Sequence, residues 1–258
     1  MPDPVRTSTV RIALVFPSLL GTYGDGGNAS VLAQRLRWRG IDADVIDVGI
    51  DDAVPEQADM YVLGGGEDTA QTLAVSRLSN GVLARVVDAG KAVFAVCAGF
   101  QILGEEFVVG RGDVVPGLGV IDCRTERLRG SRGVGELLTD SDVGVLTGYE
   151  NHGGRTVLGP DAQPLGRVRV GVGNGDTVAG HPGGDGLVQG SVVATYLHGP
   201  ALARNPRLAD HLLTRVVGEL GPLDDHEEDD LRAERLAFLR QERRTWWRRQ
   251  WRPPAMDS

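Results

Sequence analysis

Cysteine is scarce in this chain, and its scarcity excludes two kinds of protein. Among 258 residues only Cys97 and Cys123 are cysteines, so no disulfide scaffold can form. The sequence has no CxxC pair and no histidine cluster at ligand spacing, and we therefore expect no metal site. It also has no visible secretory leader and no apolar run of about 18 residues. We expect a cytoplasmic protein without a transmembrane segment, in a compartment where a free thiol stays reduced.

Aromatic residues and positive charge are also in short supply. Phe, Trp and Tyr make up 5% of the residues, and the formal net charge is −8. An acidic body argues against nucleic acid as a partner. Hydrophobic residues, at 41%, are still sufficient at this length to bury the core of a large α/β domain. The 37 glycines predict many turns and close backbone contacts.

The first half of the chain predicts alternating strands and helices. Short apolar runs predict strands, and helical spacing predicts helices; the strands fall at 10–16, 43–48, 60–63 and 91–96, and the helices at 28–40 and 69–88. We expect Asn28 to cap the first helix. Such alternation indicates a mainly parallel central sheet flanked by helices, with ligands at the carboxyl ends of the strands.

After residue 110 the pattern becomes rich in β-structure. Short β-like segments with frequent glycines fall at 143–149, 167–172 and 191–197. Asn205 and Pro206 then predict the capped start of a helix that runs to about residue 219. We therefore expect three segments: a loose N-terminus over 1–9, one domain over 10–220 and a charged helical or disordered tail over 221–258.

The tail differs in composition from the rest of the chain. Six acidic residues fall within 224–230, helical spacing follows over 231–240, and six arginines within 240–252 surround Trp246, Trp247 and Trp251. One interpretation is a charge-patterned, partly disordered terminal helix. The other is a docking element for a partner or an anionic surface, because Trp and Arg favour interfaces. Both interpretations stay open.

Cys97 is the strongest candidate for a catalytic nucleophile in this sequence. It ends the predicted strand at 91–96, and the small residues Ala95, Ala98 and Gly99 flank it. Small residues permit a tight turn from strand to helix. A cysteine at such an elbow lies at a helix N-terminus, where backbone N–H groups favour a thiolate. The alternative is an inert cysteine in the core.

A cysteine nucleophile needs a base and an oxyanion hole. His152 and His198 each follow a predicted strand, and we favour His198 because Gly199 and Pro200 turn the chain directly behind it. The remaining histidines fall in a glycine-rich turn or at the surface: His181, His211 and His226.

Two glycine-rich loops invite a role in binding. The loop at 64–66 follows a strand and presents bare N–H groups, so we assign Gly65 to the oxyanion hole together with the amide after Cys97. The loop at 21–27 lacks both the G-K-[ST] ending of a P-loop and the spacing of a dinucleotide fold, and we reject both.

Together these segments resemble the class I glutamine amidotransferases of the cobyric-acid-synthase-like branch. Residues 95–101 (AVCAGFQ) resemble the nucleophile elbow of that family, and 196–200 (YLHGP) its histidine segment. Three further segments are similar to those of the amidotransferase subunits of lipid II isoglutaminyl synthases: 22–28 (TYGDGGN), 63–68 (LGGGED) and 150–156 (ENHGGRT). The resemblance covers about residues 10–218 and implies a flavodoxin-like α/β fold.

The resemblance also implies a reaction. Cys97 would attack the side-chain amide of glutamine, His198 would move the proton, and an arginine would hold the α-carboxylate of the substrate. Arg132 best matches the substrate arginine of the family, and Arg124, Arg127 and Arg129 are the alternatives in register. A Mur-ligase-like partner, carrying ATP and Mg²⁺, would use the ammonia to amidate D-glutamate in lipid II during peptidoglycan synthesis. We expect no cofactor in this chain.

One position departs from the pattern of many class I enzymes. These carry a glutamate two residues after the histidine, and here that residue is Pro200. The third member of the site must then come from elsewhere in the chain, from the partner, or not exist at all. We also keep two other functions open: an amidotransferase of another pathway, such as cofactor synthesis, and a non-catalytic binding protein.

Overall fold

The computed structural model describes residues 9–178 and 180–250, excepting the side chains of Val178 and of residues from 240 onward. The expected loose N-terminus therefore lies, apart from Thr9, outside the described residues. The chain divides between Leu223 and Asp224 into two units, which are taken in turn below.

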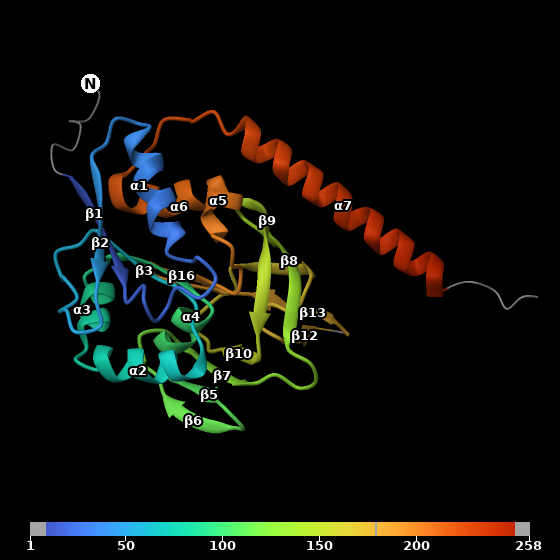
Figure 1. Cartoon of the computed structure of the whole chain (residues 1–258), viewed down its shortest axis with the longest axis horizontal. Helices are drawn as coiled ribbons and strands as arrows, with labels where there is room; N and C mark the ends of the chain where they lie inside the picture. Colours follow the sequence, from blue (N-terminus) through green and yellow to red (C-terminus); the bar gives the residue numbers. More distant parts are fainter. Residues whose placement is uncertain (1–8, 179, 251–258) are drawn as a thin grey trace, which may run out of the picture. The chain divides into compact units, whose positions relative to one another are not determined.

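A six-stranded sheet with the order β15-β16-β4-β3-β1-β2 forms the centre of the first unit (Figure 1). Its strands are β1 (Val10–Val15), β2 (Ala43–Val48), β3 (Met60–Leu63), β4 (Ala92–Val96), β15 (Leu187–Gln189) and β16 (Val192–Thr195). Only β15 runs antiparallel to its neighbour. Every residue of β3, β4 and β16 is buried, as expected for parallel strands that helices cover on both faces.

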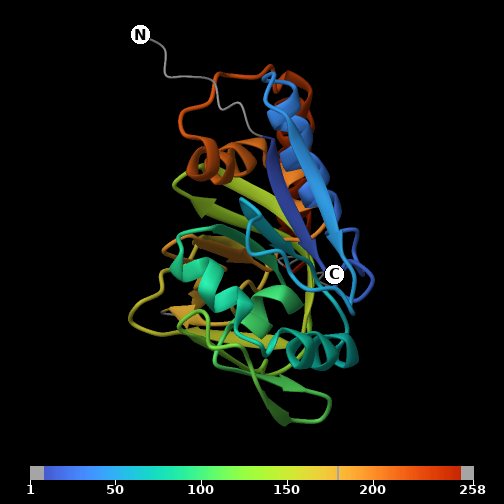
Figure 2. The same cartoon turned by 90° about the vertical axis from the view of Figure 1, so that its left-hand side faces the viewer.

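Helices cover the two faces of this sheet (Figure 2). On one face lie α1 (Gly27–Arg37), the short α5 (Ala201–Arg204) and α6 (Pro206–Val217). On the other lie α2 (Asp68–Leu78), α3 (Val82–Asp88) and α4 (Ala98–Leu103). This is the mainly parallel, helix-flanked sheet that the alternating pattern predicts and the flavodoxin-like arrangement that the family resemblance implies. It brings the carboxyl ends of β1, β3, β4 and β16 to one edge.

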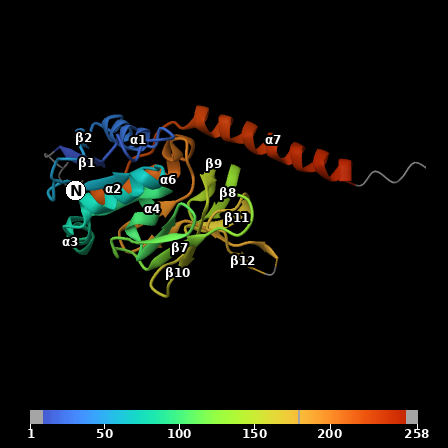
Figure 3. The same ribbon diagram turned by 60° about the horizontal axis from the view of Figure 1, so that its bottom comes forward.

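The β-rich half forms smaller sheets beside this layer (Figure 3). One has the order β10-β7-β5-β6 and another the order β14-β11-β8-β9, with β12 and β13 paired alone. Their bounds are β5 (Glu106–Val109), β6 (Asp113–Pro116), β7 (Cys123–Arg127), β8 (Gly133–Ser141), β9 (Gly144–His152), β10 (Gly154–Leu158), β11 (Gly166–Val170), β12 (Thr177–Val178), β13 (His181–Pro182) and β14 (Gly184–Asp185). The predicted β-rich second half is confirmed.

The single helix predicted at 69–88 is wrong. The structure has two helices there, because Gly81 adopts a left-handed conformation with φ of 76° that interrupts the helical path. The side chain of Asn80 then accepts a hydrogen bond from Val82 N–H at 3.0 Å, which starts α3 anew.

Two asparagines expected to cap helices have other partners. Gly26 is the N-cap residue of α1, and Asn28 Oδ1 accepts the N–H of Leu202 at 2.9 Å. Asn205 does stand at the N-cap of α6, but its Oδ1 accepts the N–H of Thr147 at 2.9 Å. Neither side chain caps a helix. Each instead links the segment after β16 to another element by a hydrogen bond: Asn28 bonds Leu202, and Asn205 bonds Thr147.

The second unit contains α7 (His226–Gln250). Its first turn contains Glu227, Glu228 and Asp229, which complement the positive end of the helix dipole. The Arg- and Trp-rich run of the tail lies beyond the described side chains, so its interpretation stays a prediction. Within residues 9–178 and 180–250 no helix combines the length and the apolar character needed to cross a membrane.

Candidate active site

Cys97 occupies a strained turn between β4 and α4. Its backbone has φ of 50° and ψ of −103°, a conformation that is costly for a residue with a Cβ. Gly99 packs so closely on β3 that an added Cβ would lie 2.7 Å from the Cβ of Leu63. The small residues around Cys97 are therefore required by the fit of the elbow against the neighbouring strand, as the sequence predicts.

The thiol of Cys97 is neutral in this environment. Burial raises its pKa to about 12, the charge of Asp25 adds to the rise, and Ala98 N–H and Arg132 oppose it. The N–H of Ala98 at the helix N-terminus does favour the thiolate, as expected, but burial outweighs that effect. The thiol can react only if a base removes its proton.

His198 is the candidate base. It is fully buried just after β16, the parallel neighbour of β4. Its Nδ1 lies 2.8 Å from Oδ2 of Asp25, which is also fully buried. A carboxylate at this nitrogen fixes the proton on Nδ1, and Nε2 keeps its lone pair. Among the described residues Nε2 has no hydrogen-bond partner, so its lone pair stays available.

His152 does not have this freedom. Its Nδ1 lies 2.9 Å from Gly154 O and its Nε2 lies 3.3 Å from Glu150 Oε2. Its ring stacks on Tyr196 with centroids 3.9 Å apart. Both nitrogens are engaged, which favours His198 as the base and leaves His152 as a wall of the pocket. The other three histidines are exposed.

Asp25 is the residue that sequence reasoning missed. It lies in the glycine-rich loop between β1 and α1, which the sequence left without a function. Asp25 could have been found from the position of this loop, which follows the carboxyl end of β1 at the same sheet edge as Cys97. The loop fits tightly there, since a Cβ on Gly64 would lie 2.0 Å from Leu20 O and 2.9 Å from Asp25 Cβ.

Pro200 contacts the same loop. A Cβ on Gly27 would lie 2.5 Å from Cγ of Pro200. The residue that replaces the usual glutamate thus packs against the loop that brings in Asp25. The structure thus places a carboxylate of this chain, that of Asp25, beside His198.

Gly65 has a different contact from the one expected. Its N–H donates to Oδ2 of Asp25 at 2.9 Å, so it holds the carboxylate rather than facing an oxyanion. Gly66 lines the pocket beside Cys97, and the N–H of Ala98 contacts the thiol. The geometry therefore removes Gly65 from the expected oxyanion hole, leaves Ala98 as a candidate and makes Gly66 the candidate from the loop.

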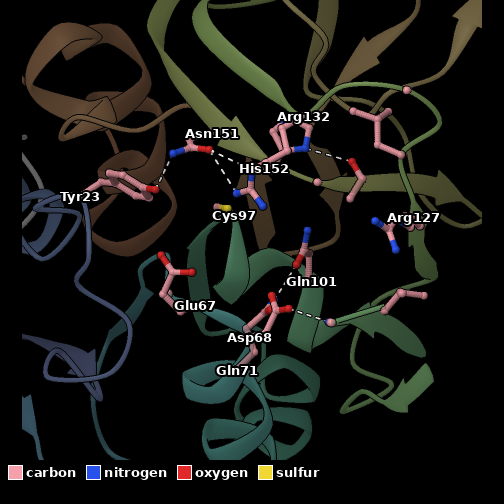
Figure 4. Close-up of a pocket in the computed structure, with 17 residues that line it drawn as sticks. Tyr23, Glu67, Asp68, Gln71, Cys97, Gln101, Arg127, Arg132, Asn151 and His152 are labelled. Atoms are coloured by element: carbon pink, nitrogen blue, oxygen red, sulfur yellow. Dashed lines mark hydrogen bonds between the residues drawn. The ribbon is translucent and has the colours of Figure 1, made fainter. Parts of the chain in front are cut away.

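A pocket of about 200 Å³ opens beside Cys97 (Figure 4). Arg132 and Arg127 both line it, whereas Arg124 and Arg129 do not. The guanidinium of Arg132 donates to Asn151 Oδ1 at 3.1 Å, and Asn151 Nδ2 donates to the hydroxyl of Tyr23 at 2.6 Å. The predicted Arg132 thus lies where a substrate carboxylate could bind.

Tyr23 links this chain of hydrogen bonds to the base. Its ring centroid lies 4.5 Å from that of His198. Burial raises the pKa of Tyr23, and the charges of Glu67 and Cys97 add to the rise. The hydroxyl is therefore neutral and can accept from Asn151 while its ring covers the imidazole.

A buried polar network forms the floor of the pocket. Gln71 Nε2 donates to Gln101 Oε1 at 2.6 Å, and Gln101 Nε2 donates to the hydroxyl of Tyr196 at 3.0 Å. Tyr196 in turn lies 2.6 Å from Thr156 Oγ1. Within the part of the chain that the structure describes, no group of three or more His, Cys, Asp or Glu residues could hold a metal ion.

Comparison with known proteins identifies the family of this chain. Residues 11–206 match the model of the CobB/CobQ-like glutamine amidotransferase domain. The chain belongs to this family. In fold, it is similar to two solved glutamine amidotransferase structures. One has a TM-score of 0.54 and 22% identity, covering 80% of this chain and 98% of that one. The other, from Thermotoga maritima, has a TM-score of 0.51 and 15% identity, covering 79% and 82%.

Relatives within the family fall into two groups. The GatD subunit of lipid II isoglutaminyl synthase from Staphylococcus aureus is 33% identical over 219 residues, which is 83% of this chain and 87% of that protein. The GatD subunit from Streptococcus pneumoniae is also 33% identical, over 81% of this chain and 80% of that protein. A probable cobyric acid synthase from Methanothermobacter thermautotrophicus is 34% identical, over 56% of this chain and 31% of its own length.

Proposed function

We propose that this chain is a glutaminase subunit that releases ammonia from L-glutamine with Cys97, His198 and Asp25. The observation that carries the proposal is the buried hydrogen bond between Asp25 and His198, at the same sheet edge as the strained Cys97. A dyad of Cys97 and His198 alone would leave the imidazole without an orienting partner.

The reaction follows from these contacts. His198 Nε2 takes the thiol proton as Sγ attacks the amide carbon of glutamine, and the developing oxyanion binds the N–H groups of Ala98 and Gly66. The imidazolium, stabilised by Asp25, then gives its proton to the departing nitrogen, which leaves as ammonia. Water, deprotonated by His198, attacks the γ-glutamyl thioester and releases glutamate with the thiol restored.

The fate of the ammonia is inferred from the relatives. Two of them are named as subunits of lipid II isoglutaminyl synthase, and this chain matches most of their length. We infer that a Mur-ligase-like partner, holding ATP and Mg²⁺, receives the ammonia and amidates the α-carboxylate of D-glutamate in lipid II to D-isoglutamine. The proposed place of action is the cytoplasm, where nucleotide and lipid-linked precursor are both available.

Ammonia and glutamate release from L-glutamine tests the first part. Wild-type protein should release both in equal amounts, and Cys97→Ala should release neither while it keeps its folded circular-dichroism spectrum. Ammonia release that Cys97→Ala retains would overturn the proposal.

Co-purification from the source tests the second part. The partner that binds this chain should carry a Mur-type nucleotide site, and the complex should amidate lipid II with glutamine and ATP. A partner that instead amidates a corrinoid acid would favour the cofactor-synthesis alternative, for which the similarity to a cobyric acid synthase is the supporting observation.

A further inference from the structure

A buried asparagine joins the loop that carries Asp25 to the segment that carries His198. Asn28, the second residue of α1, is fully buried, and its Oδ1 accepts the N–H of Leu202 at 2.9 Å. Asp25 lies three residues before Asn28, and His198 lies four residues before Leu202. This hydrogen bond therefore joins the two segments near the point where Asp25 and His198 meet.

Asn28 is also coupled to Asp25 through the backbone. The N–H of Asn28 donates to the carbonyl oxygen of Asp25 at 3.0 Å, which makes one tight turn at the start of α1. Among the described residues the carboxylate of Asp25 makes hydrogen bonds only through Oδ2, to Gly65 and His198, and its Oδ1 has no partner. A shift of the turn would therefore move the carboxylate away from His198 with no bond through Oδ1 to oppose the movement.

The segment that carries His198 is held from two sides. On one side the N–H of His198 donates to Tyr149 O at 2.7 Å, which fixes the segment to β9. On the other side Pro200 packs against the loop of Asp25, and Leu202 donates to Asn28. Packing sets only a closest approach, whereas a hydrogen bond prefers one distance and one direction. Asn28 thus supplies a directional restraint between the loop and the segment.

Only the oxygen of the Asn28 side chain is used in this contact. Its Nδ2 is buried without a hydrogen-bond partner among the described residues. The N–H of Leu202 would be buried without this acceptor if Oδ1 were lost, and such a donor is costly to leave unpaired. The segment would then move to find another acceptor. The geometry requires an acceptor at position 28 and does not require a donor.

We propose that Asn28 is a positioning residue, which keeps the carboxylate of Asp25 on Nδ1 of His198 by joining the two segments. The inference rests on the proposed function for its effect on ammonia release. Asn28 does not line the pocket beside Cys97, so it acts on the reaction through Asp25 and not through the substrate.

Kinetics of ammonia release test this role. Asn28→Ala should lower kcat by about ten- to a hundredfold, because a displacement of about 1 Å at a reacting group can cost that much. KM for L-glutamine should stay within about twofold. Asn28→Asp keeps an oxygen that can accept the N–H of Leu202 in either protonation state, and it should retain kcat within about fivefold.

The matched control is Asn80→Ala, which also removes an asparagine oxygen from a backbone N–H at the start of a helix, that of Val82 in α3. Asn80 lies outside the pocket, and its loss should change neither kcat nor KM. Should Asn28→Ala fail to fold, Asn28→Leu, which has the same branched shape without an acceptor, takes its place.

An Asp25→Ala background separates positioning from a general loss of structure. There the carboxylate is already absent, so adding Asn28→Ala should lower kcat by less than about threefold more. The free energy of unfolding should still fall by as much as it does in wild type. A loss of kcat by the same factor in both backgrounds would show a merely structural role and overturn the inference.

Proton NMR of His198 tests the contact without turnover. A proton on Nδ1 that is buried and bound to a carboxylate should give a downfield resonance, which His198→Gln assigns by its loss. Asn28→Ala should weaken or remove this resonance, whereas Asn28→Asp and Asn80→Ala should keep it. A resonance that Asn28→Ala leaves unchanged, or that wild type lacks, would overturn the inference. If the resonance behaves as expected but wild type releases no ammonia, the proposed function fails and the role of Asn28 in holding Asp25 stands.

Discussion

The carboxylate of Asp25 and the imidazole of His198 meet at 2.8 Å across 173 residues of sequence. One oxygen, Oδ2, accepts both from His198 and from the N–H of Gly65, while Oδ1 is buried without a hydrogen-bond partner among the described residues. The carboxylate is thus held by its neighbours and can in turn hold the tautomer and orientation of the histidine. In the proposed reaction its charge would also stabilise the imidazolium.

Asp25→Asn should lower kcat for ammonia release by about 10²- to 10⁴-fold. The amide has the volume of the carboxylate, and its oxygen can replace Oδ2, but it has no charge to stabilise the imidazolium. Because Asp25 contributes to the raised pKa of Cys97, the same substitution should shift alkylation of the thiol by iodoacetamide to lower pH.

The control for this substitution is Asp113→Asn, which removes an exposed carboxylate on β6. It should leave both kcat and the alkylation profile unchanged. If Asp25→Asn retained full activity, the carboxylate would have no part in the reaction, and Cys97 and His198 would act without it.

Gly27→Ala should lower the free energy of unfolding by about 1–3 kcal/mol, because the new methyl group overlaps Pro200. It should also lower kcat, since the displaced loop carries Asp25. Pro200→Ala removes the overlapping Cγ, so the double variant should recover most of both losses. Urea unfolding and ammonia release, measured for all four proteins, give the interaction energy. Additive losses would show that the two residues do not act on each other.

The parallel sheet and the Cys97 elbow could be predicted because each depends on a pattern of neighbouring residues in the sequence. A buried parallel strand is a short apolar run, and a tight elbow needs small residues at fixed offsets. Asp25 could not be predicted in this way. Its role depends on the fit of one loop against Gly64 and Pro200, and neither contact is visible as a spacing in the sequence.

The assignment of Gly65 to the oxyanion hole also failed because it depends on a contact between residues distant in the sequence. A glycine triplet after a strand indicates exposed N–H groups, but the direction of each N–H depends on what packs against the loop. Here the N–H of Gly65 donates a hydrogen bond to Asp25, and Gly66 is the glycine of the triplet that lines the pocket. The break in the helix at Gly81 could have been predicted from the sequence, because an Asn-Gly pair is a turn signal. The prediction of a single helix followed the apolar spacing instead.

Asn151→Asp should raise KM for L-glutamine about two- to fivefold, because the new carboxylate pairs with Arg132 and competes with that of the substrate. The effect is small since Arg132 is exposed to solvent. The value of kcat should stay within about twofold, as Asn151 contacts no reacting atom. Asn151→Ala removes the same hydrogen bonds without neutralising Arg132 and should raise KM less. A fall in kcat at unchanged KM would instead place Asn151 at the chemistry.

Asp185 should make the stability of the fold depend on pH. It is fully buried behind β16, where Oδ2 accepts the hydroxyl of Thr195 at 2.6 Å and Oδ1 the N–H of Tyr196 at 3.1 Å. Burial raises its pKa from 3.8 to about 6, although both hydrogen bonds oppose the rise. Between these two values the native state holds more protons than the unfolded state, so the free energy of unfolding falls as pH rises.

Asp185→Asn removes this titration. Relative to wild type, the free energy of unfolding of Asp185→Asn should therefore increase by about 2 kcal/mol between pH 4.5 and pH 7.5, whatever constant cost the amide adds. Urea unfolding of both proteins across that range measures the difference. Asp113→Asn, whose carboxylate is exposed on β6, should give a curve parallel to wild type. A difference for Asp185→Asn that stays constant with pH would show that the buried carboxyl remains ionised, and its two hydrogen bonds would then outweigh burial.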